Sequence, residues 1–132
     1  VLLALRRSDA KQLRELASQF QGRRYLFVPK FVTWADAKQI CESVGGHLVT
    51  IASEEENEFV ASLFPLGGSW FWIGLVVGKD KQKWITGEPL TYRAFVNVLQ
   101  EQTPGPRVFS GRNWCFDVVS AAHNCFMIEW DS

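Results

Sequence analysis

The sequence has few cysteines and no long apolar run. Only Cys41, Cys115 and Cys125 occur, and none belongs to a CxxC or His/Cys pattern. The chain is therefore not a disulfide-dense scaffold, and it carries no zinc-site pattern. No segment approaches the ~20 apolar residues of a membrane span, so we expect no membrane insertion in this segment. Residues 1–7 are too short for a signal peptide and lack an initiator Met, which suggests a piece of a longer protein and leaves the compartment open.

An excess of charge of either sign is also missing. Lys+Arg and Asp+Glu number 14 each, which gives a net charge of zero. Nucleic acids and anionic membranes attract a basic excess, so neither is expected as the main partner. What is present is a globular composition, with 47% hydrophobic residues and six tryptophans in 132 residues. This length and composition predict one domain with a substantial core.

The first residues predict a short amphipathic helix over 8–20. Leu13, Leu16, Ala17 and Phe20 recur at the spacing of one helical face. Such a helix could pack on the domain, link it to an upstream part, or end an oligomerising stalk. A single short apolar stripe favours packing on the domain over a stalk, because a coiled coil needs several heptads. We therefore assign 1–22 to an N-terminal helix and linker and 23–132 to the main domain, with an oligomer through the helix left open.

Two further helices are predicted from their caps and apolar faces. Thr33 caps a helix that runs through Val44 and ends at a Gly-Gly pair. Ser53 begins the next helix, and Glu56 completes a capping box. The acidic run 54–56 could suggest a metal cluster, but the helix dipole explains it more simply.

The remaining apolar runs predict strands. The most apolar of them covers 69–77, and its central Gly74 would allow another backbone to approach closely. Residues 25–28 and 84–85 predict short strands, and 107–130 predicts a three-strand meander. Residues 94–107 show no period, and a loop of that length is usually functional or mobile. Helices followed by closely spaced strands indicate an α+β fold.

These pieces together resemble a C-type lectin-like domain over residues 24–131. The matching motifs are Thr33-Trp34 with Ala37, Cys41 and Gly45-Gly46-His47-Leu48-Val49-Thr50-Ile51, then Ser53-x-Glu55-Glu56-Asn57, Trp72-Ile73-Gly74-Leu75, Trp84-Ile85-Thr86-Gly87-Glu88-Pro89 and Phe126-Met127-Ile128-Glu129-Trp130. The resemblance implies two helices flanking antiparallel sheets and termini that meet in one sheet. It also implies that the long loop after Tyr92 forms the ligand face.

The sequence departs from the members of that family that bind sugar through calcium. Those members carry Glu-Pro-Asn or Gln-Pro-Asp in the long loop, and 94–107 has neither triplet. They also carry Asn-Asp after a Trp, whereas Trp114 is followed by Cys115-Phe116 and Asp117 comes one place late. Calcium needs several oxygen ligands, usually including two or more carboxylates. We therefore expect no calcium site, no other metal and no cofactor.

The cysteines depart from the family pattern as well. The resemblance implies a bridge from the helix cysteine to the last strand, where this chain has Ile128. Cys41 is then expected to be a small buried apolar residue. Cys115 and Cys125 could form a hairpin disulfide if their strands are neighbours, or remain free buried thiols. Loss of the first bridge resembles a bacterial or otherwise diverged version of the domain.

The favoured function is a non-enzymatic, calcium-independent binding module that recognises its partner through residues 94–113. The candidate contact residues are Asn97, Gln100, Glu101, Gln102, Arg107, Arg112 and Asn113. The alternative is a carbohydrate-binding lectin domain in which Phe95, Phe109 or Trp114 stacks on a sugar. The partner is thus a protein or a glycan, and an accessory role within a larger protein also fits.

An enzyme is not expected from the sequence. His47 follows Gly45-Gly46 and is read as a structural residue. His123 and Cys125 are two residues apart on a predicted strand, but no third group orients the base. No catalytic residue is therefore assigned.

Overall fold

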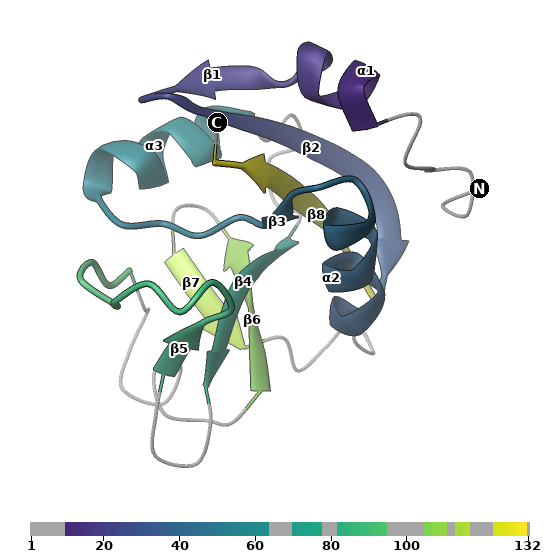
Figure 1. Cartoon of the computed structure of the whole chain (residues 1–132). Coiled ribbons are helices and arrows are strands. Elements are labelled where there is room, and N and C mark those ends of the chain that lie inside the picture. The colour runs from purple at the N-terminus through teal and green to yellow at the C-terminus, as the bar shows by residue number, and fades with distance from the viewer. Residues whose placement is uncertain are drawn as a thin grey trace.

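The computed structural model describes residues 10–63, 70–77, 82–94, 105–110, 113–116 and 123–131. These ranges hold the helices α1 (Ala10–Leu16), α2 (Trp34–Ser43) and α3 (Glu54–Leu63). The strands are β1 (Ser18–Phe20), β2 (Arg23–Val32), β3 (His47–Leu48), β4 (Phe71–Val77), β5 (Gln82–Trp84), β6 (Gly105–Ser110), β7 (Asn113–Phe116) and β8 (Asn124–Trp130). The arrangement is the predicted α+β class (Figure 1).

The strands form one mixed sheet in the order β1-β2-β8-β4-β6-β7, with β3 paired to β8 and β5 paired to β4. Strands from the two ends of the described chain lie side by side, because β2 pairs with β8 from Arg24↔Trp130 to Val32↔Asn124. β8 also pairs with β4 in parallel, so one pairing departs from the antiparallel sheets that the resemblance implied. Figure 1 shows β1, β2 and β8 in its upper half and β4 to β7 below them.

The two faces of β4 and β8 belong to two separate apolar clusters. Phe71, Ile73 and Leu75 of β4 pack in one cluster, whereas Trp72 packs in the other. β8 alternates in the same way, because successive strand side chains point to opposite faces. All seven residues of β8 are buried, as expected for a strand covered on both sides. The predicted buried strand over 69–77 is confirmed as β4.

Gly74 is the point at which three chain segments meet. Its amide donates to Val49 O at 2.8 Å, and its carbonyl accepts from the Ile85 amide at 2.9 Å. A Cβ at this position would lie 2.9 Å from Leu48 O. Only glycine permits so close a backbone approach, as the sequence had indicated.

The predicted caps of α2 and α3 are present. Thr33 Oγ1 accepts from the Asp36 amide at 3.2 Å, and Ser53 Oγ accepts from the Glu56 amide at 3.1 Å. The Glu56 carboxylate accepts from the amide of Ala52 at 2.8 Å, one residue before the N-cap. This satisfies a backbone donor at the helix start, which is the purpose of a capping box.

The first predicted helix is too long. α1 ends at Leu16, and β1 then pairs with β2 through Ser18↔Tyr25 and Phe20↔Arg23. Gln21 and Gly22 both have positive φ, 51° and 80°, as a two-residue hairpin turn requires. Phe20 stacks on Phe59 of α3 at 4.5 Å, a contact that the helical pattern did not anticipate. Leu16 is 75% exposed rather than packed. An oligomer through α1 and a domain boundary at residue 22 remain predictions.

The predicted meander over 107–130 is wrong in its last strand. β6 and β7 form a hairpin, but β8 lies beyond β6 and β4 in the sheet. Strand β8 pairs with β2 and β4 instead, and its two apolar faces fit such a central position, because both faces are covered by the two apolar clusters.

Candidate functional site

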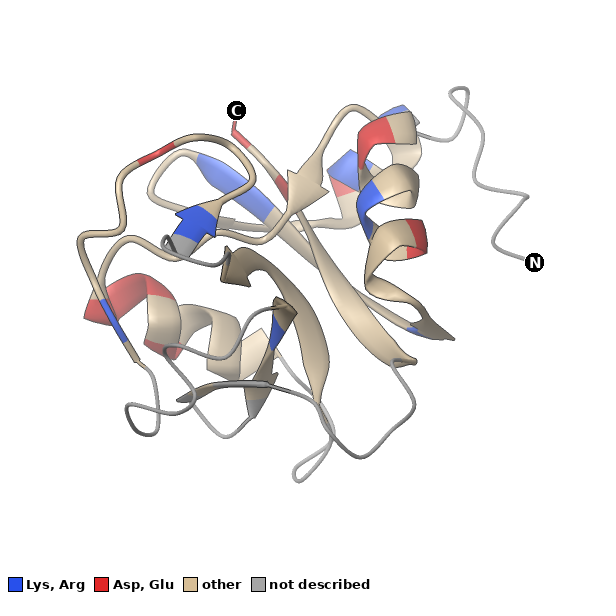
Figure 2. Ribbon diagram, turned by 90° about the horizontal axis from the view of Figure 1, so that it is seen from below, with Lys and Arg blue, Asp and Glu red and all other residues tan. Residues whose placement is uncertain are grey.

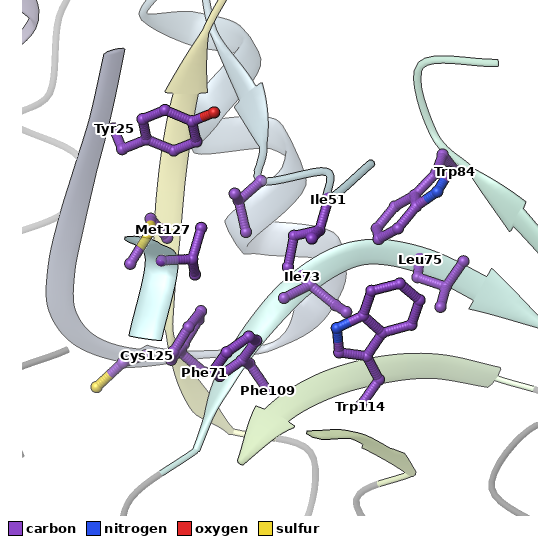
Figure 3. Packing of buried hydrophobic residues seen from close by; sticks show 12 residues of the cluster. Tyr25, Ile51, Phe71, Ile73, Leu75, Trp84, Phe109, Trp114, Cys125 and Met127 are labelled. Carbon is purple, nitrogen blue, oxygen red and sulfur yellow. The ribbon is translucent and has the colours of Figure 1, made fainter. Parts of the chain in front are cut away.

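The segment predicted as the long loop, 94–113, contains strand β6, and its first residue, Ala94, is bonded to a tryptophan-rich core. The Trp114 amide donates to Ala94 O at 2.8 Å, which ties the first end of the loop to β7. The buried Trp114 indole donates to Asn57 Oδ1 at 3.0 Å. Its ring lies edge-on to Trp84 and Tyr92, at 5.2 and 5.8 Å between centroids (Figure 3 shows the two tryptophans). A rigid base of this kind suits a loop that carries recognition.

Most of the predicted contact residues fall outside the described residues. These are Asn97, Gln100, Glu101, Gln102 and Arg112. Asn113 begins β7 and pairs with Ser110. The prediction for Arg107 is wrong, because it lies in β6 with 0% exposure. Its guanidinium donates to Gly105 O at 3.0 Å, so the charge is used inside the fold and does not face a ligand.

Two of the aromatic residues considered for sugar stacking are core residues. Phe109 is 1% exposed and stacks on Phe71 at 4.8 Å. Trp114 is 0% exposed, so neither ring offers an open face to a pyranose. Phe95 lies outside the described residues.

The considered disulfide does not form. Cys125 of β8 is a free buried thiol, and β7, which carries Cys115, is separated from β8 by β6 and β4. Three strand spacings amount to about 14 Å, well beyond the reach of a disulfide. Cys41 is free and fully buried on α2, as expected for a small apolar residue.

Iodoacetamide should leave Cys125 unmodified at neutral pH in the folded chain. Burial raises the pKa of its thiol, whereas a reactive cysteine needs a lowered pKa and access to solvent. His123 is exposed and precedes β8, so the two residues do not share a strand face. Peptide mass mapping checks the result, with denatured chain as the positive control. Rapid alkylation of Cys125 in the folded state would revive the enzyme hypothesis.

A second polar feature, missed in the sequence, is a buried carboxylate cluster formed by Glu56 and Glu129 with Arg23, Tyr25 and Thr50. Arg23 Nη1 lies 3.1 Å from Glu129 Oε2 and 3.8 Å from Glu56 Oε2. The Tyr25 hydroxyl donates to Glu56 Oε2 at 2.5 Å. The Thr50 amide donates to Glu129 Oε1 at 2.9 Å. These bonds join β2, α3 and β8 at one end of the sheet.

The two carboxylates share one partly exposed guanidinium, and the pKa of Glu129 is raised. Burial raises the pKa of Glu129 to about 7, against the opposing effects of the Thr50 amide and of Arg23. Burial also raises the pKa of Tyr25, so the phenol stays protonated as a donor. The sequence signal for this cluster is Glu129, a single charged residue within the apolar run 126–130. A buried charge requires partners, so such a residue indicates an ion pair or hydrogen bonds in the core. Its partners lie 79 and 106 residues away, which local patterns do not reveal.

His47 has partners for both ring nitrogens, in line with a structural residue. Nδ1 lies 2.7 Å from Leu48 O, and Nε2 lies 2.9 Å from Asp131 Oδ1. Among the described residues, His47, Glu129 and Asp131 are the group whose ligand atoms could hold a metal ion.

Charged positions as a whole are spread over helices and strands, and Figure 2 shows Lys and Arg interspersed with Asp and Glu.

Comparison with known proteins gives consistent matches. The model of the lectin C-type domain family matches residues 30–130. One chain of the snaclec coagulation factor IX/factor X-binding protein of Gloydius halys is 33% identical over 123 residues, covering 85% of this chain and 80% of that one. One chain of the snaclec coagulation factor IX-binding protein from the same organism is 31% identical, covering 83% and 99%.

Solved structures agree on the fold. Human lithostathine superposes with a TM-score of 0.78 at 23% identity, covering 92% of this chain and 94% of that one. The Ca²⁺-independent C-type lectin SPL-2 from Saxidomus purpuratus gives a TM-score of 0.78 at 22% identity, covering 87% and 91%. The snaclec relatives are snake proteins, so the expectation of a bacterial version finds no support. In the described part of the chain, the helices are too short or too polar to cross a membrane.

Proposed function

Because this chain belongs to the lectin C-type domain family and is a non-enzymatic binding module, we propose that it recognises a protein partner without calcium through residues 94–113. The supporting observation is the anchored base of the loop. Trp114 fixes Ala94 by a backbone hydrogen bond and is itself buried against Trp84. The polar residues of 97–102 follow this base in the sequence.

Calcium independence is supported by the sequence of the loop and by the pairing of the described carboxylates Glu56 and Glu129. The loop lacks both calcium triplets, and Asp117 does not directly follow Trp114. The buried carboxylates Glu56 and Glu129 already pair with the one guanidinium of Arg23. Calcium would have to displace Arg23 to gain these oxygens, and it needs six to eight of them.

A protein partner is favoured over a sugar for two reasons. Phe109 and Trp114, considered as sugar platforms, are buried. The snaclec relatives carry names that state binding of coagulation factors IX and X. We therefore propose that the ligand is a folded protein of the same kind as coagulation factors IX and X. These two factors are the first probes.

The test is surface plasmon resonance with factor IX and factor X over the immobilised chain, in EDTA and in calcium. The loop variant Gln100→Ala/Glu101→Ala/Gln102→Ala removes three proposed contacts. The control variant Lys38→Ala/Glu42→Ala removes an exposed ion pair of 2.8 Å on α2. Binding in EDTA that weakens about tenfold or more in the loop variant alone is expected, a scale typical of a few truncated contact residues.

Three results would contradict the proposal. Binding that disappears in EDTA would overturn calcium independence, provided that the calcium requirement lies in this chain and not in the factor. This is checked by adding calcium to the chain alone and measuring its melting temperature. If the loop and control variants weaken binding equally, the loop does not lie in the interface. Binding to a glycan array, with no binding to either factor, would favour the lectin alternative.

A further inference from the structure

The pairing of β3 with β8 brings His47, Glu129 and Asp131 together. His47 and Glu129 are directly opposite in the antiparallel ladder. Asp131 follows Glu129 by two residues, and residues at that spacing along an extended chain point to the same side. The ligand atoms of the three side chains all lie within 4.8 Å of one another. Figure 1 shows β3 beside the end of β8 that leads to the C-terminus.

The hydrogen bonds of His47 fix how its ring presents itself. A backbone carbonyl can only accept, so Nδ1, 2.7 Å from Leu48 O, carries a hydrogen. Nε2 then faces Asp131 Oδ1 at 2.9 Å. When the ring is neutral, Nε2 of His47 and Oδ1 of Asp131 are both acceptors and repel each other. Their close approach therefore requires a cation between or beside them. A proton on Nε2 is one such cation and a metal ion is the other. A carbonyl on Nδ1 is the usual partner behind a metal-binding histidine.

The surrounding charges favour a divalent cation. Glu56, Glu129 and Asp131 bring three carboxylates to this end of the sheet, and Glu88 accepts from Thr50 Oγ1 at 2.6 Å. Arg23 is the cation that pairs with Glu56 and Glu129. The group therefore carries an excess of negative charge when His47 is neutral, and a divalent ion would offset it.

We propose that His47, Glu129 and Asp131 form a binding site for Zn²⁺. One imidazole nitrogen and two carboxylates are a ligand set that suits zinc, whereas calcium prefers oxygen alone. Three protein ligands leave a fourth position for water. Asp131 has a 67% exposed side chain and provides the path of entry, and Glu129 is fully buried. The ion would join β3 to the end of β8. Short zinc motifs do not reveal this set, because His47 lies 84 residues before Asp131 in the chain.

The test titrates the full chain with zinc chloride by calorimetry, at a slightly alkaline pH that keeps imidazole neutral. Asp131→Asn and His47→Gln each remove one ligand. His123→Gln is the matched control, because it removes the other histidine of the chain. One zinc ion per wild-type chain is expected, with at least about tenfold weaker binding in both ligand variants, since even outer partners of metal sites matter on that scale. The His123→Gln variant should bind like wild type.

Nitrogen-15 spectra of the histidine rings provide a second readout that needs no variant. Zinc should shift the Nε2 resonance of His47 and leave that of His123 in place, and calcium should do neither. The proposal is overturned if zinc does not bind, if His123→Gln loses binding, or if Asp131→Asn binds as wild type does. Asp131 is largely exposed, so its isosteric variant keeps the test valid even if His47→Gln fails to fold.

Discussion

Replacing Trp114 with alanine should lower the free energy of unfolding by about 3–5 kcal/mol, the range for removing a large buried aromatic side chain. The side chain is 0% exposed and packs against Trp84 and Tyr92. The substitution opens a cavity and removes the indole donor to Asn57 Oδ1. Denaturant unfolding followed by circular dichroism measures the loss.

Two further variants separate the causes. Trp114→Phe keeps a ring and removes the indole N–H, so it should cost less than alanine, on the order of 1–3 kcal/mol. Lys38→Ala changes an exposed residue of α2 and should stay within about 0.5 kcal/mol of wild type. A loss below about 1 kcal/mol in Trp114→Ala would mean that this ring does not hold the base of the loop, because large-to-small core substitutions cost more than that.

The second large effect is a dependence of stability on pH that comes from Glu129. In EDTA, the free energy of unfolding should fall as pH rises from the usual glutamate pKa of 4.5 toward about 7, relative to a Glu129→Gln variant. In this window the folded chain holds a proton on Glu129 that the unfolded chain has released. Stability from the raised pKa is therefore complete below 4.5 and is lost as pH rises through about 7.

The size of this effect follows from the shift. One pKa unit corresponds to about 1.4 kcal/mol, so the wild type should lose a few kcal/mol more than Glu129→Gln across the window. Burial lowers the pKa of His47, whereas its hydrogen bond to Asp131 and the charge of Glu129 raise it, with a net increase, so Glu129→Gln also removes the part of this increase that comes from Glu129. Urea titrations at a series of pH values provide the curves. Parallel curves for the two proteins would show that Arg23 keeps Glu129 ionised throughout.

The helices α2 and α3 and the strand β4 could be predicted because their signals are local. Thr33 and Ser53 accept hydrogen bonds from amides three residues ahead. The aromatic run of β4 is dense enough to indicate a buried strand by itself. Gly74 was also readable, since a glycine within a buried strand indicates a close backbone approach.

Features that depend on distant partners could not be predicted. The apolar spacing of residues 13–20 predicted a helix up to Phe20. The turn at Gln21 and Gly22, with its positive φ values, instead places Ser18–Phe20 as a strand beside β2. The position of β8 between β2 and β4 is a property of the sheet, so chain order wrongly placed β8 beside β7. Arg107 looked like a loop residue because its charge is unusual in a core, and the backbone carbonyls that accept from it are invisible to pattern analysis.

The site itself was predictable only as a region. The absence of calcium triplets could be read directly from the residues, whereas the segment predicted to be irregular, 94–107, ends in strand β6, which begins at Gly105. The buried carboxylate cluster required the β2–β8 and β3–β8 pairings, which join residues that are separated by most of the chain.

Hydrogen exchange of the chain bound to factor IX in EDTA tests the central claim most directly, because it reports where the partner lies without any substitution. We predict new protection of amides within 94–113 outside strand β6, which already pairs with β4 and β7, with α1, α2 and β1 unchanged. Protection of α2 or of the β1–β2 hairpin, with 94–113 exchanging as in the free chain, would contradict recognition through this loop.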